Sequence, residues 1–88
     1  MSTHTSHPDI IKRLKRADGH LKSIISMIEE ERDCLQIAQQ LQAVERAIGN
    51  AKKTLVRDHI DHCLEHAVRS GAKDAETIRE FKEITKYL

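Results

Sequence analysis

The chain has 88 residues, of which 39% are hydrophobic and 33% charged, with one Phe, one Tyr and no Trp. So little apolar material excludes a large core, and we expect one small domain that oligomerisation stabilises. Because Pro and Gly are scarce and no run of alternating apolar residues appears, the sequence predicts an all-α fold without strands.

The charges are nearly balanced, with a formal net charge of +1, so net charge alone does not indicate a nucleic-acid partner. The start lacks a basic segment followed by an apolar one, and no apolar run approaches the roughly 18 residues of a membrane span. We therefore expect a cytoplasmic protein without a membrane partner. In a reducing compartment, the two cysteines are expected as free thiols, metal ligands or redox sensors rather than as a structural disulfide.

Residues 1–7, MSTHTSH, are small and polar, and we expect a flexible N-terminal arm before a single helical domain over residues 8–88. The arm carries His4 and His7. Histidines in a short polar tract belong either to a plain tail or to a metal site, so both are candidate metal donors.

The first predicted helix begins at Ser6 or His7. Pro8 suits its first turn, and Asp9 lies beside the positive end of the helix dipole. The helix is expected to extend to about Glu31. Apolar residues along it recur at spacings of four and three, which is typical of a helix packed against another helix. They are Ile10, Leu14, Ala17, Leu21, Ile24 and Ile28.

Another side of this helix carries five cations within eleven residues, with Asp18 as the only acid between Ile10 and Lys22. Such a patch is either a solvated helix face or a surface that binds phosphates, where each Lys or Arg contributes affinity without reading the base sequence. The five cations are Lys12, Arg13, Lys15, Arg16 and Lys22. Three cations of the next helix would extend the patch, namely Lys52, Lys53 and Arg57.

The central stretch from Asp33 to Ser70 contains no Pro and keeps its apolar residues at helical spacing. We expect one helix of about 57 Å, at about 1.5 Å rise per residue. Asp33 is the predicted N-cap, and Gln36 completes a capping-box pattern. Cys34 is then the first helical residue, where the helix dipole favours the thiolate.

A third helix is predicted from about Asp74, after Gly71 has ended the central helix. We expect it to form a short cover for the bundle. Its inward-facing residues are predicted to be Ile78, Phe81, Ile84 and Leu88.

Three good metal ligands share one face of the central helix. His59 and Cys63 are four residues apart, and Cys34 lies 25 residues before His59, close to a whole number of turns. Cys34 and His59 would nevertheless be about 37 Å apart along one straight helix. They can meet if two chains pair antiparallel about a two-fold axis near Ala47 and Ile48, which creates two identical sites. This dimer would bury an apolar stripe made of Ile37, Ala38, Leu41, Ile48, Leu55 and Val56.

Two thiolates and one imidazole form a soft ligand set that suits Cu(I), and a fourth nitrogen donor would adapt the set to Ni(II), Co(II) or Zn(II). Taken singly, a Cys is commonly a small buried hydrophobe, and a His on an apolar face is commonly a core residue. The shared face and the separations that fit an antiparallel dimer favour a metal site.

Three segments of the chain carry a family pattern, namely RLKRADGHL, DCLQIAQQLQAVERAI and DHIDHCLEHAV. With them, the chain resembles the CsoR/RcnR family of metal-sensing repressors from about His7 to Val68. The resemblance implies a three-helix protomer, an antiparallel dimer and a tetramer of two dimers. It also implies a repressor without a helix-turn-helix, which binds double-stranded operator DNA in the apo state and releases it when metal binds. Metal efflux or detoxification genes are the expected targets.

The resemblance places Cys34, His59 and Cys63 on the family's metal-ligand positions. Arg13 falls on an arginine of the first helix that is associated with DNA binding. Glu80 matches, after a gap of one residue, an acidic residue that orients the ligand histidine. The candidate DNA-binding residues are Lys12, Arg13, Lys15, Arg16, Lys52 and Lys53.

Copper sensors of this family commonly have Tyr before the first ligand, where this chain has Asp33. Nickel sensors add an N-terminal histidine, for which His4 and His7 are the candidates. Cu(I) and Ni(II)/Co(II) are therefore nearly balanced, and the Cys, His, Cys trio slightly favours Cu(I). Formaldehyde sensors lack the final Cys and persulfide sensors lack the His, so both functions are less expected.

Functions outside this family use fewer of these features. A cytosolic metal carrier would use the same ligands without needing the basic patch, and a structural helical module would bind no metal. An enzyme with a small-molecule substrate is least expected, because the helical plan offers no evident substrate pocket.

Overall fold

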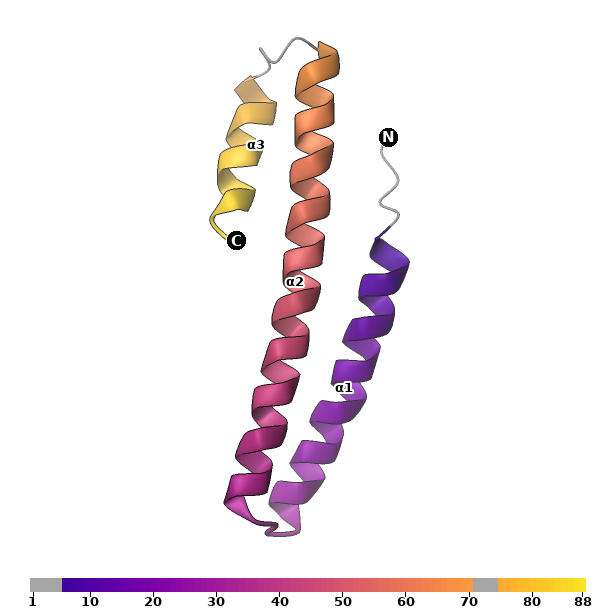
Figure 1. Ribbon diagram of the computed structural model, residues 1–88, viewed down its shortest axis with the longest axis vertical. Coiled ribbons are helices and arrows are strands. Elements are labelled where there is room, and N and C mark those ends of the chain that lie inside the picture. Colours follow the sequence, from indigo (N-terminus) through magenta and orange to yellow (C-terminus); the bar gives the residue numbers. More distant parts are fainter. Residues whose placement is uncertain (1–5, 71–74) are drawn as a thin grey trace. The chain divides into compact units, whose positions relative to one another are not determined.

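The computed structural model describes residues 6–70 and 75–88, which form α1 (His7–Glu29), α2 (Cys34–Ser70) and α3 (Ala75–Thr85) (Figure 1). No strand occurs within the two described ranges. The predicted all-α fold with one long central helix is confirmed. The predicted junction of the second and third helices rested on Gly71 and Asp74, which lie outside the described residues. None of the described helices is both long and apolar enough to cross a membrane.

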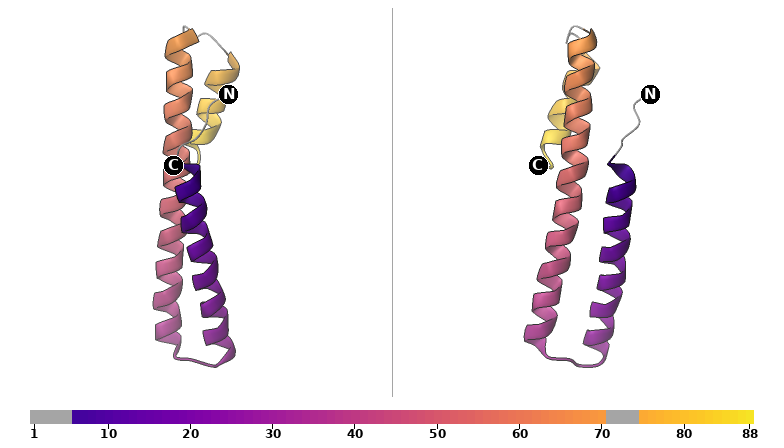
Figure 2. Two further views of the ribbon diagram at one scale, coloured as in Figure 1. Left: turned by 90° about the vertical axis from the view of Figure 1, so that its right-hand side faces the viewer. Right: turned by 45° about the vertical axis from the view of Figure 1, so that its right-hand side comes forward.

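The chain divides into two compact units, with the boundary inside α2 between Lys52 and Lys53. The N-terminal unit, residues 8–52, contains α1 and the first half of α2 as an antiparallel helical hairpin, whose two arms lie side by side in both views of Figure 2. The C-terminal unit contains the second half of α2 and α3, together with Ser6 and His7. A single domain over residues 8–88 after an arm of residues 1–7 stays a prediction.

Backbone hydrogen bonds end α1. The Glu31 N–H donates to the Ile28 carbonyl at 3.0 Å, and the Arg32 N–H donates to the Met27 carbonyl at 3.0 Å, which together form a Schellman motif. Glu31 accordingly has a left-handed backbone, with φ of 56°. This conformation costs a residue other than glycine roughly 1–2 kcal/mol. Helix α1 therefore ends at Glu29, slightly before the predicted end.

The start of α2 matches the prediction. The Asp33 carboxylate accepts a hydrogen bond from the Gln36 N–H at 3.3 Å, and the Asp33 carbonyl accepts one from the Ile37 N–H at 3.1 Å. Asp33 is thus the N-cap, and Cys34 is the first helical residue.

The core of the N-terminal unit is a narrow seam of residues spaced seven apart: Ile10, Ala17 and Ile24 from α1, and Val44 and Ala51 from α2. The other half of the predicted α1 stripe is exposed, with Leu14, Leu21 and Ile28 at 44%, 39% and 54%. The single chain covers one row of the predicted stripe, and packing of the other row stays a prediction. Each helix of a two-helix hairpin has only one neighbour, so a single row of side chains is buried and the adjacent row is left uncovered.

The C-terminal unit has an even smaller core. Val56 is 2% exposed and Cys63 is 8% exposed, and from α3 only Phe81 and Ile84 are half-buried among the predicted inward residues. Ile78 and Leu88 are 47% and 66% exposed, so their predicted inward orientation is wrong. Leu88 lies beyond the end of α3, and the helix, at 11 residues, is too short to cover a wide face.

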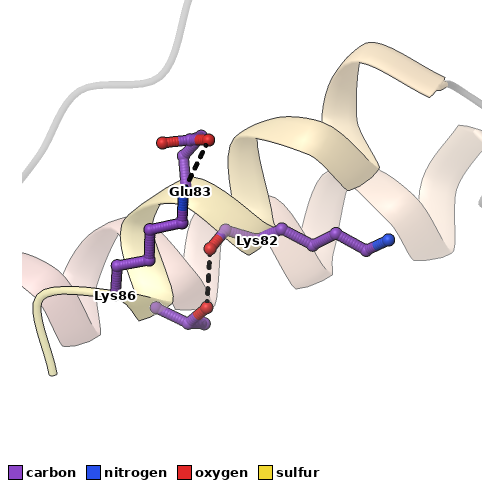
Figure 3. Close-up of polar contacts among 4 residues, drawn as sticks. Lys82, Glu83 and Lys86 are labelled. Atoms are coloured by element: carbon purple, nitrogen blue, oxygen red, sulfur yellow. Dashed lines mark hydrogen bonds and ion pairs between the residues drawn. The ribbon is translucent and has the colours of Figure 1, made fainter.

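Local contacts complete the end of α3 (Figure 3). The Thr85 hydroxyl donates to the Lys82 carbonyl at 2.8 Å, and the Lys86 ammonium lies 3.1 Å from the Glu83 carboxylate. The Lys86 N–H also donates to the Glu83 carbonyl at 3.2 Å. These contacts lie on the exposed side of the helix, so they define where α3 ends without adding to the core.

Candidate metal centre

Within the C-terminal unit, α2 and α3 bring together three side chains that could ligate a metal. His59 and Cys63 lie one turn apart on α2 and face the same way. Glu80 comes from α3. One candidate ligand atom from each of the three residues lies within 4.8 Å of the other two. His59, Cys63 and Glu80 therefore form a cluster inside one unit of one chain.

The His59 imidazole of α2 is in contact with the Glu80 carboxylate of α3. Nε2 of His59 lies 3.0 Å from Oε1 of Glu80. A neutral imidazole that donates from Nε2 to this carboxylate carries its lone pair on Nδ1, which is the form that can bind a metal. The predicted apposition of Glu80 and His59 is thus present, while the orienting role of Glu80 stays a prediction.

The Cys63 thiol is shielded from water. Burial, with a smaller contribution from the negative charge of Glu80, raises the pKa of this thiol above its ordinary value. The thiol is therefore protonated in the apo protein at neutral pH, and any metal that bound this sulfur would have to displace that proton.

The residues present fit a transition metal. One thiol, one imidazole and one carboxylate within ligand reach suit Zn(II), Ni(II) or Co(II), whereas Cu(I) calls for a second soft donor. Cys34 is the candidate for that donor. It is exposed at the first residue of α2, belongs to the N-terminal unit and is not a member of the cluster. The predicted trio of Cys34, His59 and Cys63 therefore stays a prediction that needs a second chain.

The other predicted donors lie outside the cluster. His4 is not among the described residues, and His7 is the first residue of α1, where it is half-buried. Their roles as metal ligands stay predictions.

The candidate DNA-binding residues are all exposed. Five of them belong to the N-terminal unit and Lys53 to the C-terminal unit. Two of the α1 cations have carboxylate partners: Arg13 lies 2.8 Å from Asp9 and Lys22 lies 3.1 Å from Asp18. Both pairs are solvent-exposed, so they contribute little to stability.

One basic residue of this surface was missed by the sequence reasoning. His20 lines the same hollow as Arg13 and Arg16. It lies four residues after Arg16 and seven after Arg13, a helical spacing that places all three on one face. This spacing is the signal in the sequence that could have identified His20. The neighbouring lysines of α1 make the set of Arg13, Arg16 and His20 hard to recognise.

A long central helix, a His/Cys/carboxylate cluster and a basic helix face are together the features of an all-helical metal sensor. Residues 6–87 match the family model described as metal-sensitive transcriptional repressor. The copper-sensing transcriptional repressor CsoR of Bacillus subtilis is 38% identical over 88% of this chain and 79% of its own length. The copper-sensing transcriptional repressor RicR of Mycobacterium tuberculosis is 35% identical over 74% of this chain and 68% of its own length.

Solved structures show the same fold. The nickel-responsive transcriptional regulator InrS superposes with a TM-score of 0.85 at 26% identity, covering 100% of this chain and 99% of InrS. The copper-sensing repressor CsoR with Cu(I) from Geobacillus thermodenitrificans superposes with a TM-score of 0.79 at 30% identity, covering 98% of this chain and 88% of that one. The chain belongs to the CsoR/RcnR family of metal-sensitive transcriptional repressors. It is a metal-responsive repressor and not an enzyme.

Proposed function

We propose that this repressor binds operator DNA in the apo state and releases it when a transition metal fills a site shared by two protomers. One protomer contributes Cys34, and the other contributes His59 and Cys63. The carrying observation is that His59 and Cys63 share one face of α2 with Glu80 held against the imidazole. Metal efflux or detoxification genes are the proposed targets.

Cu(I) is the slightly favoured metal, ahead of Ni(II) and Co(II). Support comes from the soft trio and from relatives that are described as copper-sensing. Two observations favour the alternative. The solved structure of InrS is described as nickel-responsive. Moreover, Asp33, at the position where copper sensors commonly have Tyr, uses its carboxylate to cap α2 and accepts the Gln36 N–H at 3.3 Å.

Exposed apolar residues of α2 support the antiparallel dimer, whereas Val56 of the predicted stripe is already buried within the protomer. Leu41, Ile48 and Leu55 recur every seven residues and are 44%, 44% and 41% exposed in the single chain. Covering what remains exposed of each side chain would contribute roughly 1 kcal/mol. A second copy of α2 lying along this row would also carry Cys34 toward His59 and Cys63, and we propose that two such dimers form the tetramer.

A subunit-mixing experiment tests the shared site. A Cys34→Ala protein and a His59→Ala/Cys63→Ala protein should each bind metal weakly. After subunit exchange, each heterodimer should contain one intact site and one site without any of the three ligands. Recovery of about half of the wild-type stoichiometry is expected in the heterodimer. Confirmed exchange without recovered binding would show that the ligands do not come from two chains.

Operator release tests the regulatory role and the metal together. The protein is titrated with Cu(I), Ni(II), Co(II) and Zn(II) in competition with chelators of known affinity, and release of a labelled operator duplex is followed in the same samples. The inducing metal should release the duplex at stoichiometric occupancy. A protein that binds metal but no duplex under any condition would instead be a metal carrier.

A further inference from the structure

The N-terminal unit has a hollow of about 200 Å³ between its two helices. Its lining comes from both helices: Arg13, Arg16, Ala17 and His20 of α1, and Ala47 and Asn50 of α2. All six residues belong to the same compact unit, so the hollow is a feature of one hairpin.

Small residues create this hollow. Ala17 and Ala47 have the smallest side chains of the six lining residues, and Ala17, which is 6% exposed, lies in the seam between the helices. Larger side chains at these two positions would fill the space. The two arginines and His20 surround the space that the alanines leave.

The chemistry of the lining matches an anion. Two guanidinium groups supply fork-shaped N–H donors that fit the oxygens of a phosphate, while the imidazole and the carboxamide supply further polar groups. No carboxylate lines the hollow. Asp9 binds Arg13 through Nε at 2.8 Å, which uses one of the five N–H donors and leaves the pair of terminal nitrogens.

The imidazole is held in place from the other helix. Nε2 of His20 lies 2.5 Å from Oε1 of Gln40, and both residues are half-buried. With the amide oxygen as acceptor, Nε2 is the donor in this contact. The contact joins α1 to α2 and holds the His20 ring against the wall of the hollow, so the ring is positioned before any ligand arrives.

We propose that this hollow is an oxyanion site that takes one tetrahedral phosphoryl group, supplied in the repressor by a backbone phosphate of the operator. This inference rests on the proposed DNA binding. Arg13 and Arg16 donate hydrogen bonds to the phosphate and the His20 ring packs beside it, whereas Lys12 and Lys15 attract DNA only through their charge. Free inorganic phosphate has the same chemistry and can serve as a probe.

Charge-preserving variants separate direct contact from general attraction. Arg13→Lys and Arg16→Lys keep the charge but lose the fork, so operator affinity should fall by about tenfold for each. Arg32→Lys and Arg46→Lys are the matched controls, and they should stay within about twofold of wild type because these exposed arginines of the same unit neither line the hollow nor belong to the candidate DNA-binding residues. Fluorescence anisotropy with a labelled duplex at fixed salt measures all four.

His20 is tested with two variants, because it takes part in the contact between helices. His20→Gln keeps a polar group and should lower operator affinity by about threefold to tenfold with unchanged helicity. Gln40→Leu removes the partner of His20 and should give a smaller loss through the same ring. His20→Gln at wild-type affinity would remove His20 from the site.

An inorganic phosphate titration identifies the source of the anion. At constant ionic strength, phosphate but not chloride should shift the His20 ring and Arg16 Nε–H resonances in a saturable way, and Arg16→Lys should abolish the shift. Operator duplex should suppress the same shift. A saturable phosphate shift that duplex does not suppress would overturn the assignment to DNA, and the absence of any shift would overturn the site.

Failure of this inference is distinguishable from failure of the proposed function. Equal losses in the Arg13→Lys and Arg16→Lys variants and in the Arg32→Lys and Arg46→Lys controls would overturn the oxyanion site while leaving a DNA-binding repressor. A wild-type protein that binds no duplex would overturn both.

Discussion

The two compact units differ in whether their candidate functional residues are buried or exposed. The N-terminal unit builds its core from aliphatic residues and Ala alone, and its cations are all exposed on the surface. Among the described residues of the C-terminal unit, Cys63 and Val56 are the two buried hydrophobic residues. Cys63 is therefore both a candidate metal ligand and a core residue. The six candidate DNA-binding residues are exposed and do not belong to the core. Substitution of Cys63 should therefore change both stability and function, whereas substitution of a candidate DNA-binding residue should change function alone.

The largest expected effect that would test this contrast is the loss of metal binding in Cys63→Ser. Loss of a group that only supports a ligand lowers metal affinity by up to about a hundredfold. Removing a thiolate ligand itself should therefore lower Cu(I) affinity by more than that. The same variant should be less stable because a hydroxyl replaces a buried thiol. Chelator competition and thermal unfolding measure the two effects. Arg16→Ala is the control and should keep the thermal stability of wild type. Lowered stability in this variant would show that the candidate DNA-binding residues also stabilise the fold.

The next effect is the coupling between the two units. Metal bound at the proposed shared site should weaken operator binding by the basic residues of the N-terminal unit by about 1–3 kcal/mol, and DNA should weaken metal binding by the same factor. The apo protein should nevertheless be folded, helical and oligomeric, because the apolar row of α2 does not depend on metal. Metal titrations with and without operator test the coupling, and circular dichroism with sedimentation of chelator-treated protein tests the folding. Equal metal affinity with and without operator would show that metal binding and DNA binding are not coupled.

A smaller effect concerns the choice of metal. Deleting residues 1–7 should lower Ni(II) affinity by at least about tenfold, or about 1.4 kcal/mol, and leave Cu(I) affinity nearly intact, because Ni(II) requires a fourth donor. His7 is also the first residue of α1, so the double variant His4→Ala/His7→Ala is the matched control that keeps the helix start. An equal loss for both metals, or no loss for either, would show that these histidines do not discriminate.

The smallest effect is a pH dependence of stability that arises from Cys63 in the C-terminal unit. Burial raises the pKa of the Cys63 thiol, so the folded state binds more protons than the unfolded state near and above pH 9. The contribution of the protonated thiol to stability is fully present below the ordinary thiol pKa and is lost as the pH rises through the folded pKa. Unfolding of the apo protein by urea should show this loss, and Cys63→Ala should remove it. A loss of equal size in Cys63→Ala would assign it to other groups.

Much of this architecture could be predicted because its signals are local. The absence of Pro over α2, the Asp33 cap and the turn-spaced His59 and Cys63 depend on nearby residues, and the structure has each of them. Side-chain burial could not be predicted equally well. Periodicity shows which face of α1 is apolar, but the width of the buried row depends on how many neighbours the helix has.

Two further features left no clear signal in the sequence. The left-handed residue that ends α1 is Glu31, where glycine would have been the usual marker. The hollow depends on two alanines, Ala17 and Ala47, that belong to different helices. Their proximity follows from the register of the hairpin, which the sequence does not specify residue by residue.

The contrast between an exposed Cys34 and a buried Cys63 makes the two sulfurs chemically distinguishable. A maleimide reagent should modify Cys34 first in the native protein, because Cys63 is shielded and its thiol is harder to ionise. A single fluorophore can thus be attached at the start of α2 without mutagenesis. In the proposed dimer, Cys34 lies beside the second chain and is shielded by it. The rate at which the reagent modifies Cys34 would then report the rate of subunit dissociation.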